Sequence, residues 1–318
     1  MRNSQDLLSC QNNILEGEPD LTMLQSVPAE ITLETPPVIP PSNGRFDPRN
    51  NLNDLTGKEW VYFLSSVDAT AYAVSGQESY GHHLRKAHPS PKPPQLMRRL
   101  VEFFTKRDGW VLDPFAGVGG TLLGCALAGR NGVGVELASQ YADIYAKVCA
   151  SENLTQQPFI VGDAHSLQAY PQVSERVFDM ILTDPPYASM MNNPQDGEKK
   201  KRTGRSDPTP FTSDVADLGN LPYFAFLDEL KTVMEGALAY LKPRGYLVLF
   251  TKDLQPTLEH HNMLHADIVS KFMTIENLAY KGYKIWYDKT TNLYPFGYPY
   301  QFVANQLHQY ILVFQKLK

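Results

Sequence analysis

The chain has 318 residues, of which 42% are apolar and 20% are charged, so it is long enough for one large domain with a full core or for two small ones. No apolar run reaches the roughly 18 residues of a membrane-spanning helix and no secretion signal is visible, which predicts a cytoplasmic protein without membrane contact. The three cysteines have no metal-ligand spacing, so no metal site is expected, and Cys125 and Cys149 are predicted to be buried thiols.

Residues 1–45 are predicted to form a poorly ordered, acidic tail that becomes Pro-rich from Pro36 onward. Residues 1–35 contain six acids and one base, so they account for the whole formal net charge of −5. The remaining chain is neutral in sum. It can still hold a basic groove for a polyanion, because the distribution of charge matters more than its total. Residues 46–318 are expected to form the main domain.

Beyond the tail, the apolar pattern predicts helices and strands in alternation. Helices are expected at residues 52–74, 96–104, 119–129, 139–150, 222–241 and 257–279. Strands are expected at residues 110–113, 132–136, 158–162, 177–183, 245–251, 283–287 and 308–315. Such alternation is typical of an α/β, doubly wound sheet, in which ligands bind beyond the carboxyl ends of the strands.

A glycine-rich turn follows the first strand of this alternation. Residues 110–121 read Trp-Val-Leu-Asp-Pro-Phe-Ala-Gly-Val-Gly-Gly-Thr, so the strand ends at Asp113 and the glycines, Gly117 and Gly119 among them, let a ligand approach the backbone closely. The dinucleotide fingerprint fails because position 122 is Leu, and no Lys-Ser/Thr pair makes a phosphate-binding loop. A carboxylate at the tip of the strand suits a cationic ligand instead.

Two more strands end in acids. Glu136 closes residues 132–136 and lies 23 residues after Asp113, the spacing at which an acid hydrogen-bonds ribose hydroxyls. Asp163 closes the next strand and is placed to meet an adenine amine. Each acid alone could be an ordinary residue at the end of a strand, but an acid at each of several successive strand ends is hard to explain by chance.

The segment Asp184-Pro185-Pro186-Tyr187 directly follows another apolar strand. Proline fixes φ and removes a backbone donor, and it pushes the preceding residue out of the helical region. The segment is therefore predicted to be a stiff, extended turn that presents Asp184 and Tyr187 outward, with two free carbonyl groups. Acceptors beside an aromatic ring suit a planar base that carries an amine.

Taken together, these motifs resemble the amino-directed DNA methyltransferases, which methylate adenine N6 or cytosine N4. The resemblance covers roughly residues 50–318. It is also carried by His88-Pro89-Ser90-Pro91-Lys92-Pro93, by residues 241–246 and by residues 308–315. The resemblance implies a Rossmann-like, seven-stranded methyltransferase sheet with an antiparallel terminal hairpin. It also implies S-adenosylmethionine as the cofactor.

The resemblance assigns roles to the motif residues on the cofactor side. Asp113 would bind the methionine ammonium, Glu136 the ribose and Asp163 the adenine. The amides of Gly117 and Gly119 would line the ligand, Pro114 and Phe115 would shape its pocket, and His88 and Lys92 would contact the methionine end.

On the acceptor side, Asp184 would accept one hydrogen of the target amine and the Pro185 carbonyl the other, which directs the nitrogen lone pair at the methyl group. Tyr187 would stack on a base that has been flipped out of double-stranded DNA. Neither a metal nor a covalent intermediate is needed. The absence of any Pro-Cys dipeptide argues against cytosine C5 methylation, which needs a cysteine nucleophile.

Two further segments are candidates for DNA contact. The insertion at residues 190–221 carries a basic cluster that either contacts DNA phosphates or is a solvated loop; its members are Lys199, Lys200, Lys201, Arg202 and Arg205. The aromatic-rich segment Trp286–Tyr300 either packs as a cap over the edge of the sheet or stacks on the flipped base and its neighbours. The target-recognition region could be residues 46–90, the insertion, or residues 290–305.

The choice of base and nucleic acid stays open at this point. An aspartate at the first position of the Pro-Pro-Tyr motif favours adenine N6, with cytosine N4 as the alternative. RNA guanine N2 methyltransferases share the motif and are the next rival, ahead of protein glutamine methyltransferases and inactive relatives. We expect a site-specific enzyme of the cytoplasm, associated with the nucleoid and paired with a restriction endonuclease in a restriction-modification system.

Overall fold

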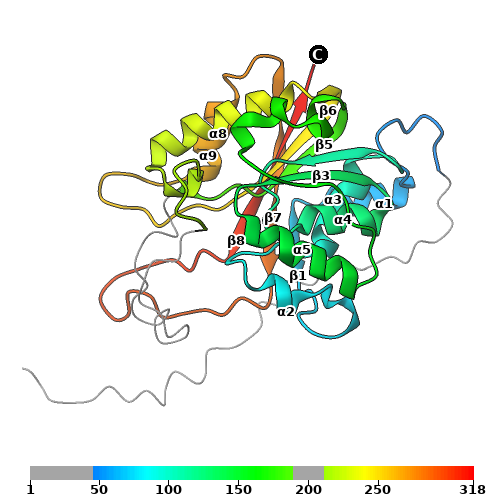
Figure 1. Cartoon of the computed structure of the whole chain (residues 1–318). Helices are drawn as coiled ribbons and strands as arrows, with labels where there is room; N and C mark the ends of the chain where they lie inside the picture. Colours follow the sequence, from blue (N-terminus) through cyan, green and yellow to red (C-terminus); the bar gives the residue numbers. More distant parts are fainter. Residues whose placement is uncertain (1–45, 189–210) are drawn as a thin grey trace, which may run out of the picture. The chain divides into compact units, whose positions relative to one another are not determined.

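One eight-stranded sheet runs through residues 46–188 and 211–318, the part of the chain that the computed structural model describes (Figure 1). These residues belong to one unit, Thr35–Lys318. The strands, in the order β1-β7-β8-β6-β5-β2-β3-β4, are β1 (Val67–Thr70), β7 (Leu278–Asp288), β8 (His308–Lys316), β6 (Leu241–Thr251), β5 (Phe178–Thr183), β2 (Trp110–Asp113), β3 (Asn131–Glu136) and β4 (Phe159–Val161). Only β8 runs antiparallel to its neighbours, β6 and β7. The predicted α/β sheet with an antiparallel terminal hairpin is confirmed.

The strand β1 is the one element of the sheet that the sequence did not predict. Residues 52–74 were expected to be helical, but the helix α1 (Gly57–Phe63) ends early and β1 follows it. β1 pairs in parallel with β7, Val67 opposite Ile285, and makes an eighth strand at the edge. The buried Lys284 of β7 fixes this corner, because its ammonium donates to the Phe63 carbonyl over 2.5 Å. Four residues are too few to show an alternating pattern, so only the partner strand defines β1.

The longer helices otherwise lie close to the predicted ranges, apart from the last one, and the short helices were not predicted. The longer helices are α3 (Pro94–Phe104), α4 (Gly120–Ala128), α5 (Ser139–Ser151), α8 (Tyr223–Leu238) and α9 (Leu264–Phe272). The short ones are α2 (His82–Arg85), α6 (Pro171–Ser174), η2 (Gln77–Ser79), η3 (Ala164–Ala169) and η5 (Leu218–Asn220).

The helix α9 is much shorter than the predicted range 257–279. It begins where the Asp253 carboxylate accepts from the amide of His265 over 3.1 Å. After it, the chain turns at Asn277, which has φ of 60°. The last apolar residues of the predicted helix, such as Leu278, belong to β7. The prediction ran too far because these strand residues happen to fit the helical spacing of the apolar residues before them.

Successive residues of the central strands pack into two separate cores. Leu112 and Ile181 face the core that contains α8 and α9, whereas Val111 and Met180 face the core that contains α3 and Phe63 of α1. Figure 1 shows α8 and α9 on one side of the sheet and α3 and α4 on the other. Because both faces are buried, the carboxyl ends of the strands are the place where a ligand can approach the sheet.

Two predictions about side chains and membranes can be checked on the described residues. Cys125 and Cys149 are buried free thiols, as predicted. Burial raises the pKa of the Cys125 thiol far above its ordinary value, so this group is a packing element. Within residues 46–188 and 211–318, none of the helices has the length and apolar character needed to cross a bilayer.

Candidate functional site

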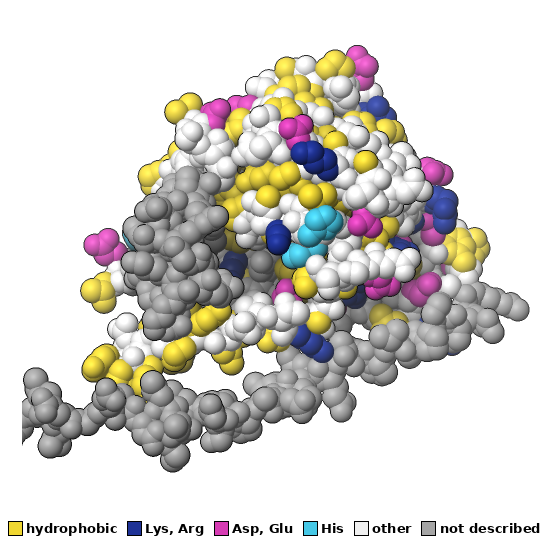
Figure 2. All heavy atoms as spheres, turned by 60° about the horizontal axis from the view of Figure 1, so that its bottom comes forward, with side chains coloured by type: hydrophobic (Ala, Val, Ile, Leu, Met, Phe, Trp, Pro, Cys, Tyr) yellow, Lys and Arg dark blue, Asp and Glu magenta, His cyan; other side chains and the backbone are white. Residues whose placement is uncertain are grey.

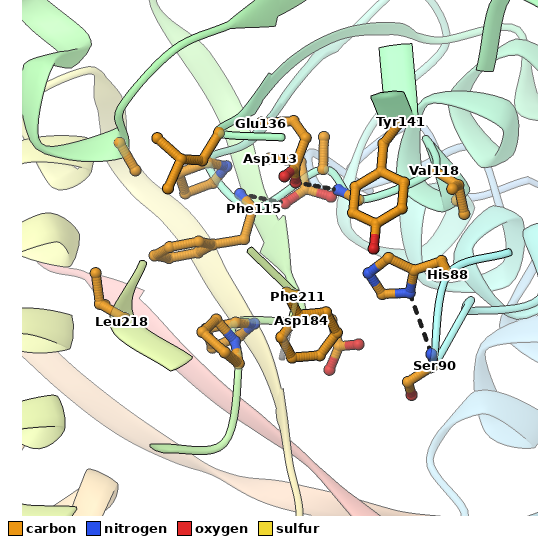
Figure 3. Close-up of a pocket in the computed structure, with 18 of the residues that line it drawn as sticks. His88, Ser90, Asp113, Phe115, Val118, Glu136, Tyr141, Asp184, Phe211 and Leu218 are labelled. Atoms are coloured by element: carbon orange, nitrogen blue, oxygen red, sulfur yellow. Dashed lines mark hydrogen bonds between the residues drawn. The ribbon is translucent and has the colours of Figure 1, made fainter. Parts of the chain in front are cut away.

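The carboxyl ends of β2, β3, β4 and β5 meet at one cavity, here called the first cavity (Figure 3). All four acids predicted at strand ends line it: Asp113, Glu136, Asp163 and Asp184. Its empty space, counted together with the solvent at its mouth, is about 1060 Å³. The four acids that the sequence singled out therefore lie at one cavity, and their contacts decide what each can do.

Asp113 is a buried carboxyl that joins two strands. Its Oδ1 accepts from the Thr183 hydroxyl of β5 over 2.7 Å and from the amide of Phe115 over 3.0 Å. Burial raises its pKa to about 6, although these hydrogen bonds act in the opposite direction. Asp113 thus closes the base of the first cavity and gains from any cation that binds beside it.

Glu136 holds the glycine turn in place. Its Oε2 accepts from the Gly117 amide over 2.8 Å, and its Oε1 accepts from the Ala138 amide over 2.8 Å. Burial raises its pKa to about 7, against the effect of both amides. Gly117 and Gly119 have φ of 50° and 77°, values that favour glycine. At Gly117 an added Cβ would lie 3.2 Å from the His88 Nε2, so the absence of a side chain keeps the cavity open.

Asp163 is the most accessible acid of the cofactor side, with 35% of its side chain exposed. Its Oδ1 accepts from the His165 amide over 2.9 Å and lies 2.9 Å from the His165 Nδ1. The His165 Nε2 is 3.0 Å from a carboxylate oxygen of Glu229 in α8. This chain of contacts orients the Asp163 carboxylate at the rim of the cavity.

Asp184 has partners on both of its oxygens. The Lys92 ammonium forms an ion pair with Oδ2, and the Tyr187 hydroxyl donates to Oδ1 over 2.6 Å. Lys92 was expected at the methionine end of the cofactor, and the structure places it against Asp184 instead. The side chains of Lys92 and Asp184 are 3% and 15% exposed, so the pair is largely removed from water.

Tyr187 does not point outward, so that part of the prediction is wrong. The residue is 7% exposed and packs in the core that contains α8 and α9. The physical reason is that its hydroxyl finds a carboxylate partner inside the fold, which lets the ring be buried without an unpaired polar atom. Burial and the neighbouring Asp184 raise the pKa of Tyr187 well above its ordinary value.

Two aromatic contacts over the first cavity were missed by the sequence. The His88 ring lies between Tyr141, at 4.8 Å between ring centres, and Phe211, at 5.2 Å (Figure 3). Phe211 and Leu218 lie in the described end of the insertion and form one wall. Burial lowers the pKa of His88 to about 4, so its ring is neutral near pH 7. The sequence offers one sign of this wall, which is Asp217 as a helix-capping residue. Its carboxylate accepts from the amide of Gly219 over 2.8 Å and so caps η5.

A second cavity lies beside the first and shares Ser90, Pro91 and Lys92 with it. Its other walls come from the ends of the strands on the far side of β5, and they are Lys252, Trp286, Asp288, Thr291, Leu307 and Gln309. The Gln309 Oε1 is 3.5 Å from the Tyr187 hydroxyl. Lys92 therefore borders both cavities, and its partner Asp184 lines the first.

The loop between β7 and β8 leaves the rim of the second cavity and exposes its aromatic side chains. Tyr298 and Tyr300 are 61% and 92% exposed, so these two rings do not pack as a cap, whereas Trp286 at the start of the segment is buried; Phe302, just beyond the segment, is 93% exposed. The loop keeps its form because the Asn305 side chain pairs with both backbone groups of Tyr294, at 2.9 and 2.7 Å. Figure 1 shows it extending away from the sheet.

The predicted basic cluster, Lys199, Lys200, Lys201, Arg202 and Arg205, lies outside the described residues, as does the acidic tail. On the face in Figure 2, the Lys and Arg side chains that are coloured are scattered among apolar and acidic ones. The role of the cluster in contacting DNA therefore stays a prediction.

Comparisons with known proteins agree with this arrangement. A family model described as DNA methylase matches residues 47–147, from α1 through the glycine turn and Glu136 into α5. The putative methylase YubD of Escherichia coli is 44% identical over 54 residues, 17% of this chain and 24% of that protein. The type II methyltransferase M.MthZI of Methanothermobacter thermautotrophicus is 42% identical over 52 residues, 16% of this chain and 15% of that protein.

A third relative acts on RNA according to its name. The tRNA (guanine(10)-N2)-dimethyltransferase of Pyrococcus abyssi is 28% identical over 114 residues, 36% of this chain and 33% of that protein. Each of these three matches covers a third or less of the relative's length. The matched segments thus identify a shared methylase core, and the acceptor has to be inferred from the site.

Proposed function

We propose that this chain is an amino-directed DNA methyltransferase that moves a methyl group from S-adenosylmethionine to the exocyclic amine of a base in DNA, adenine N6 in the first place. The DNA methylase model that matches residues 47–147 and the methylase relatives support this family. The observation that carries the proposal is the place of Asp184. Its carboxylate stands at the end of β5, beside the first cavity, and Lys92 borders both cavities. An acceptor group for an amine thus lines the proposed cofactor site and is paired with a lysine that also borders the proposed substrate site.

S-adenosylmethionine is the cofactor, and the residues of the first cavity fit it. Its ammonium and sulfonium are cationic, and three carboxylates, Asp113, Glu136 and Asp163, line that cavity. Asp113 would hold the ammonium, Glu136 the ribose and Asp163 the adenine, with Pro114 and Phe115 shaping the walls. The Gly117 amide donates to Glu136 and thereby orients this acid. The ligand would therefore contact the backbone at other positions of the turn, Gly119 among them. When bound, the cofactor supplies an electrophilic methyl group.

The chain's own residues then act on the amine. A carboxylate oxygen accepts through about two directions, so Asp184 can receive an amine N–H while it keeps Lys92 and Tyr187. The Pro185 carbonyl takes the other N–H, and Pro185 and Pro186 keep the turn rigid. Both acceptors stabilise the positive charge that develops on the nitrogen, and the carboxylate then takes its proton. The second cavity would receive the flipped base, and stacking by Tyr187 would need the ring to leave its buried position.

The alternatives differ in the base that enters the second cavity. Cytosine N4 offers the same amine and needs no change in the roles of Asp184 and Pro185. A guanine N2 in RNA is the second candidate, supported by the match to the Pyrococcus abyssi protein over 114 residues. We favour DNA because the family model that matches residues 47–147 is a DNA methylase. The basic cluster, Lys199, Lys200, Lys201, Arg202 and Arg205, would then contact DNA phosphates.

The proposal extends to the setting of the enzyme. We place it in the cytoplasm at the nucleoid, as a site-specific enzyme of a restriction-modification system with a paired endonuclease. The type II methyltransferases among its relatives support this setting.

Purified protein tests the proposed function directly. It is incubated with S-adenosylmethionine carrying a labelled methyl group and with mixed-sequence duplex DNA or total tRNA, and the nucleosides are separated after digestion. Label in N6-methyladenine from DNA is the expected result. Label in N4-methylcytosine would change the base, and label only in N2-methylguanosine from tRNA would move the function to RNA.

A further inference from the structure

The side chain of Lys92 occupies an unusual place for an ammonium group. It comes from the segment before α3, yet its Nζ forms an ion pair with Asp184 at the end of β5. Two aromatic faces surround it, the Phe250 ring at 5.2 Å from Nζ to the ring centre and the Tyr187 ring at 6.0 Å. With 3% of the side chain exposed, this cation is held by one carboxylate and two rings in place of water.

Asp184 needs such a partner to do its work. Burial favours the protonated form of a carboxyl, and the buried carboxyl of Asp113 is an electrostatic neighbour of the same sign. A protonated Asp184 would donate its own hydrogen from one oxygen and would be a poor acceptor for an amine N–H. An adjacent cation offsets both effects, because it stabilises the ionised form.

The two partners of Asp184 also set its orientation. Lys92 takes Oδ2 and Tyr187 takes Oδ1, so rotation of the carboxylate would break both contacts. A carboxylate fixed through both oxygens is preorganised for an incoming donor, which avoids reorganisation during the reaction. Tyr187 therefore supports Asp184 in the buried position that the structure shows.

We propose that Lys92 is a positioning residue that keeps Asp184 ionised and correctly oriented for the target amine. The inference rests on the proposed function and deepens it. It differs from the expected role of Lys92 at the methionine end of the cofactor. Lys92 does not touch the reacting atoms in this account, because it acts on them through Asp184.

The same strand offers a matched control pair. At the other end of β5, Lys242 forms an ion pair with Asp179, and these side chains are 44% and 25% exposed. Asp179 also accepts from the amide of Trp110 over 2.8 Å. Both pairs join a lysine to an aspartate of one strand, but only the Lys92 pair is largely buried and lines the cavities.

A thermal unfolding cycle tests the pairing without any need for activity. Lys92→Met leaves the Asp184 charge without its cation, so the variant should unfold at a clearly lower temperature. Adding Asp184→Asn should then raise the unfolding temperature of Lys92→Met, and Lys242→Met should have the smaller effect because its pair is more exposed. Purely additive losses in the double variant would overturn the coupling.

The rate profile tests the consequence for catalysis. The ionisable groups that face Asp184 are Lys92, Tyr187, His88 and Asp113. Without Lys92, the ionised form of Asp184 loses the neighbouring positive charge that stabilises it. The acid limb of kcat for Lys92→Met should therefore move upward by about one pH unit or more, so the loss of rate should be largest at low pH and smaller at higher pH.

Two comparisons separate this role from others. Lys92→Arg keeps the charge, so its acid limb should stay near that of the wild type even if the rate falls. The Kd for S-adenosylhomocysteine should stay within about twofold in Lys92→Met, whereas a rise of about tenfold or more would make Lys92 a cofactor ligand and overturn the proposal. An unmoved acid limb would overturn it too. A wild type that methylates no nucleic acid would overturn the proposed function alone, because the unfolding cycle would still report on the pair.

Discussion

The two cavities that share Lys92 are built in different ways. The first is closed by acids already held by the protein itself, with Asp113 bound to Thr183 and Glu136 bound to the amides of the glycine turn. The second is formed by the ends of strands distant in sequence, and a loop with exposed aromatic rings leaves its rim. The difference agrees with the proposed function, in which a small cofactor would bind in the first cavity and a base of a nucleic acid in the second.

A substitution of Asp184, which lines the first cavity, should give the largest effect. Asp184→Ala removes the acceptor for the amine but leaves the carboxylates of the first cavity in place. We expect methyl transfer to fall by about a thousandfold or more, with the Kd for S-adenosylhomocysteine within about twofold. Labelled-methyl transfer and calorimetry measure the two quantities. Substantial residual transfer would remove Asp184 from its assigned role.

A substitution in the glycine turn should disrupt the first cavity. Gly119 has φ of 77°, and a side chain there would run into the Tyr145 ring. Gly119→Ala should lower the free energy of unfolding by about 2–4 kcal/mol and abolish tight cofactor binding. Gly236 is the control, since it lies in α8 with open space around it, and Gly236→Ala should instead stabilise the protein by about 0.5–1 kcal/mol. Equal effects at both positions in urea titrations would contradict the role of the turn.

The raised pKa values of the first cavity predict that cofactor affinity depends on pH. Glu136 and Asp113 have pKa values of about 7 and about 6, so the free protein holds protons on them below those values. A ligand that binds the ionised acids must release these protons, so its affinity should rise as the pH increases through 6 to 7 and then level off. We expect S-adenosylhomocysteine to bind about tenfold more tightly at about pH 8 than at about pH 5.5.

Glu136→Gln should flatten most of that dependence, and a profile unchanged by this substitution would contradict the assignment. The same shifts have a consequence for stability. Because the folded protein binds these protons more tightly than the unfolded chain does, both groups cost increasing stability as the pH rises from about 4 to about 7. Thermal unfolding of the free protein across this range measures the effect, and bound cofactor should reduce it.

The second cavity can be probed at the exposed rings of the loop between β7 and β8. Replacing Tyr300 and Phe302 by alanine removes side chains that are 92% and 93% exposed, so the unfolding temperature should hardly change. If these rings stack on bases near the flipped position, the Kd for DNA should weaken by about tenfold. Val177→Ala, at an apolar residue that is 65% exposed elsewhere, is the control. Equal DNA affinity in all three proteins would leave the loop without a role in binding.

The contrast between the cavities also explains what the sequence could predict. The strands that end at Asp113, Glu136 and Thr183 were predicted to within a residue or two, because apolar runs followed by turn residues are local signals. The four acids of the first cavity followed from the rule that ligands bind at the carboxyl ends of parallel strands. Local sequence patterns were therefore enough to predict most of the residues that line the first cavity.

The positions of the other site residues could not be predicted, because they depend on contacts between segments distant in the sequence. Lys92 was expected beside the cofactor, and nothing in its own segment shows that its partner lies 92 residues away. Tyr187 was expected to face outward, because the hydroxyl contact that allows its burial is a tertiary one. Phe211 lies in an insertion with no periodic pattern, and only its stacking on His88 shows that it forms a wall.

The central claim is that this chain methylates an exocyclic amine in DNA through Asp184. Sequencing of the methylated bases in DNA from methylation-free cells that express the chain tests it most directly, with cells that express Asp184→Ala alongside. We predict one recurring sequence with N6-methyladenine, present with the wild type and absent with Asp184→Ala. Unmodified DNA from cells that contain folded, cofactor-binding protein would contradict the claim.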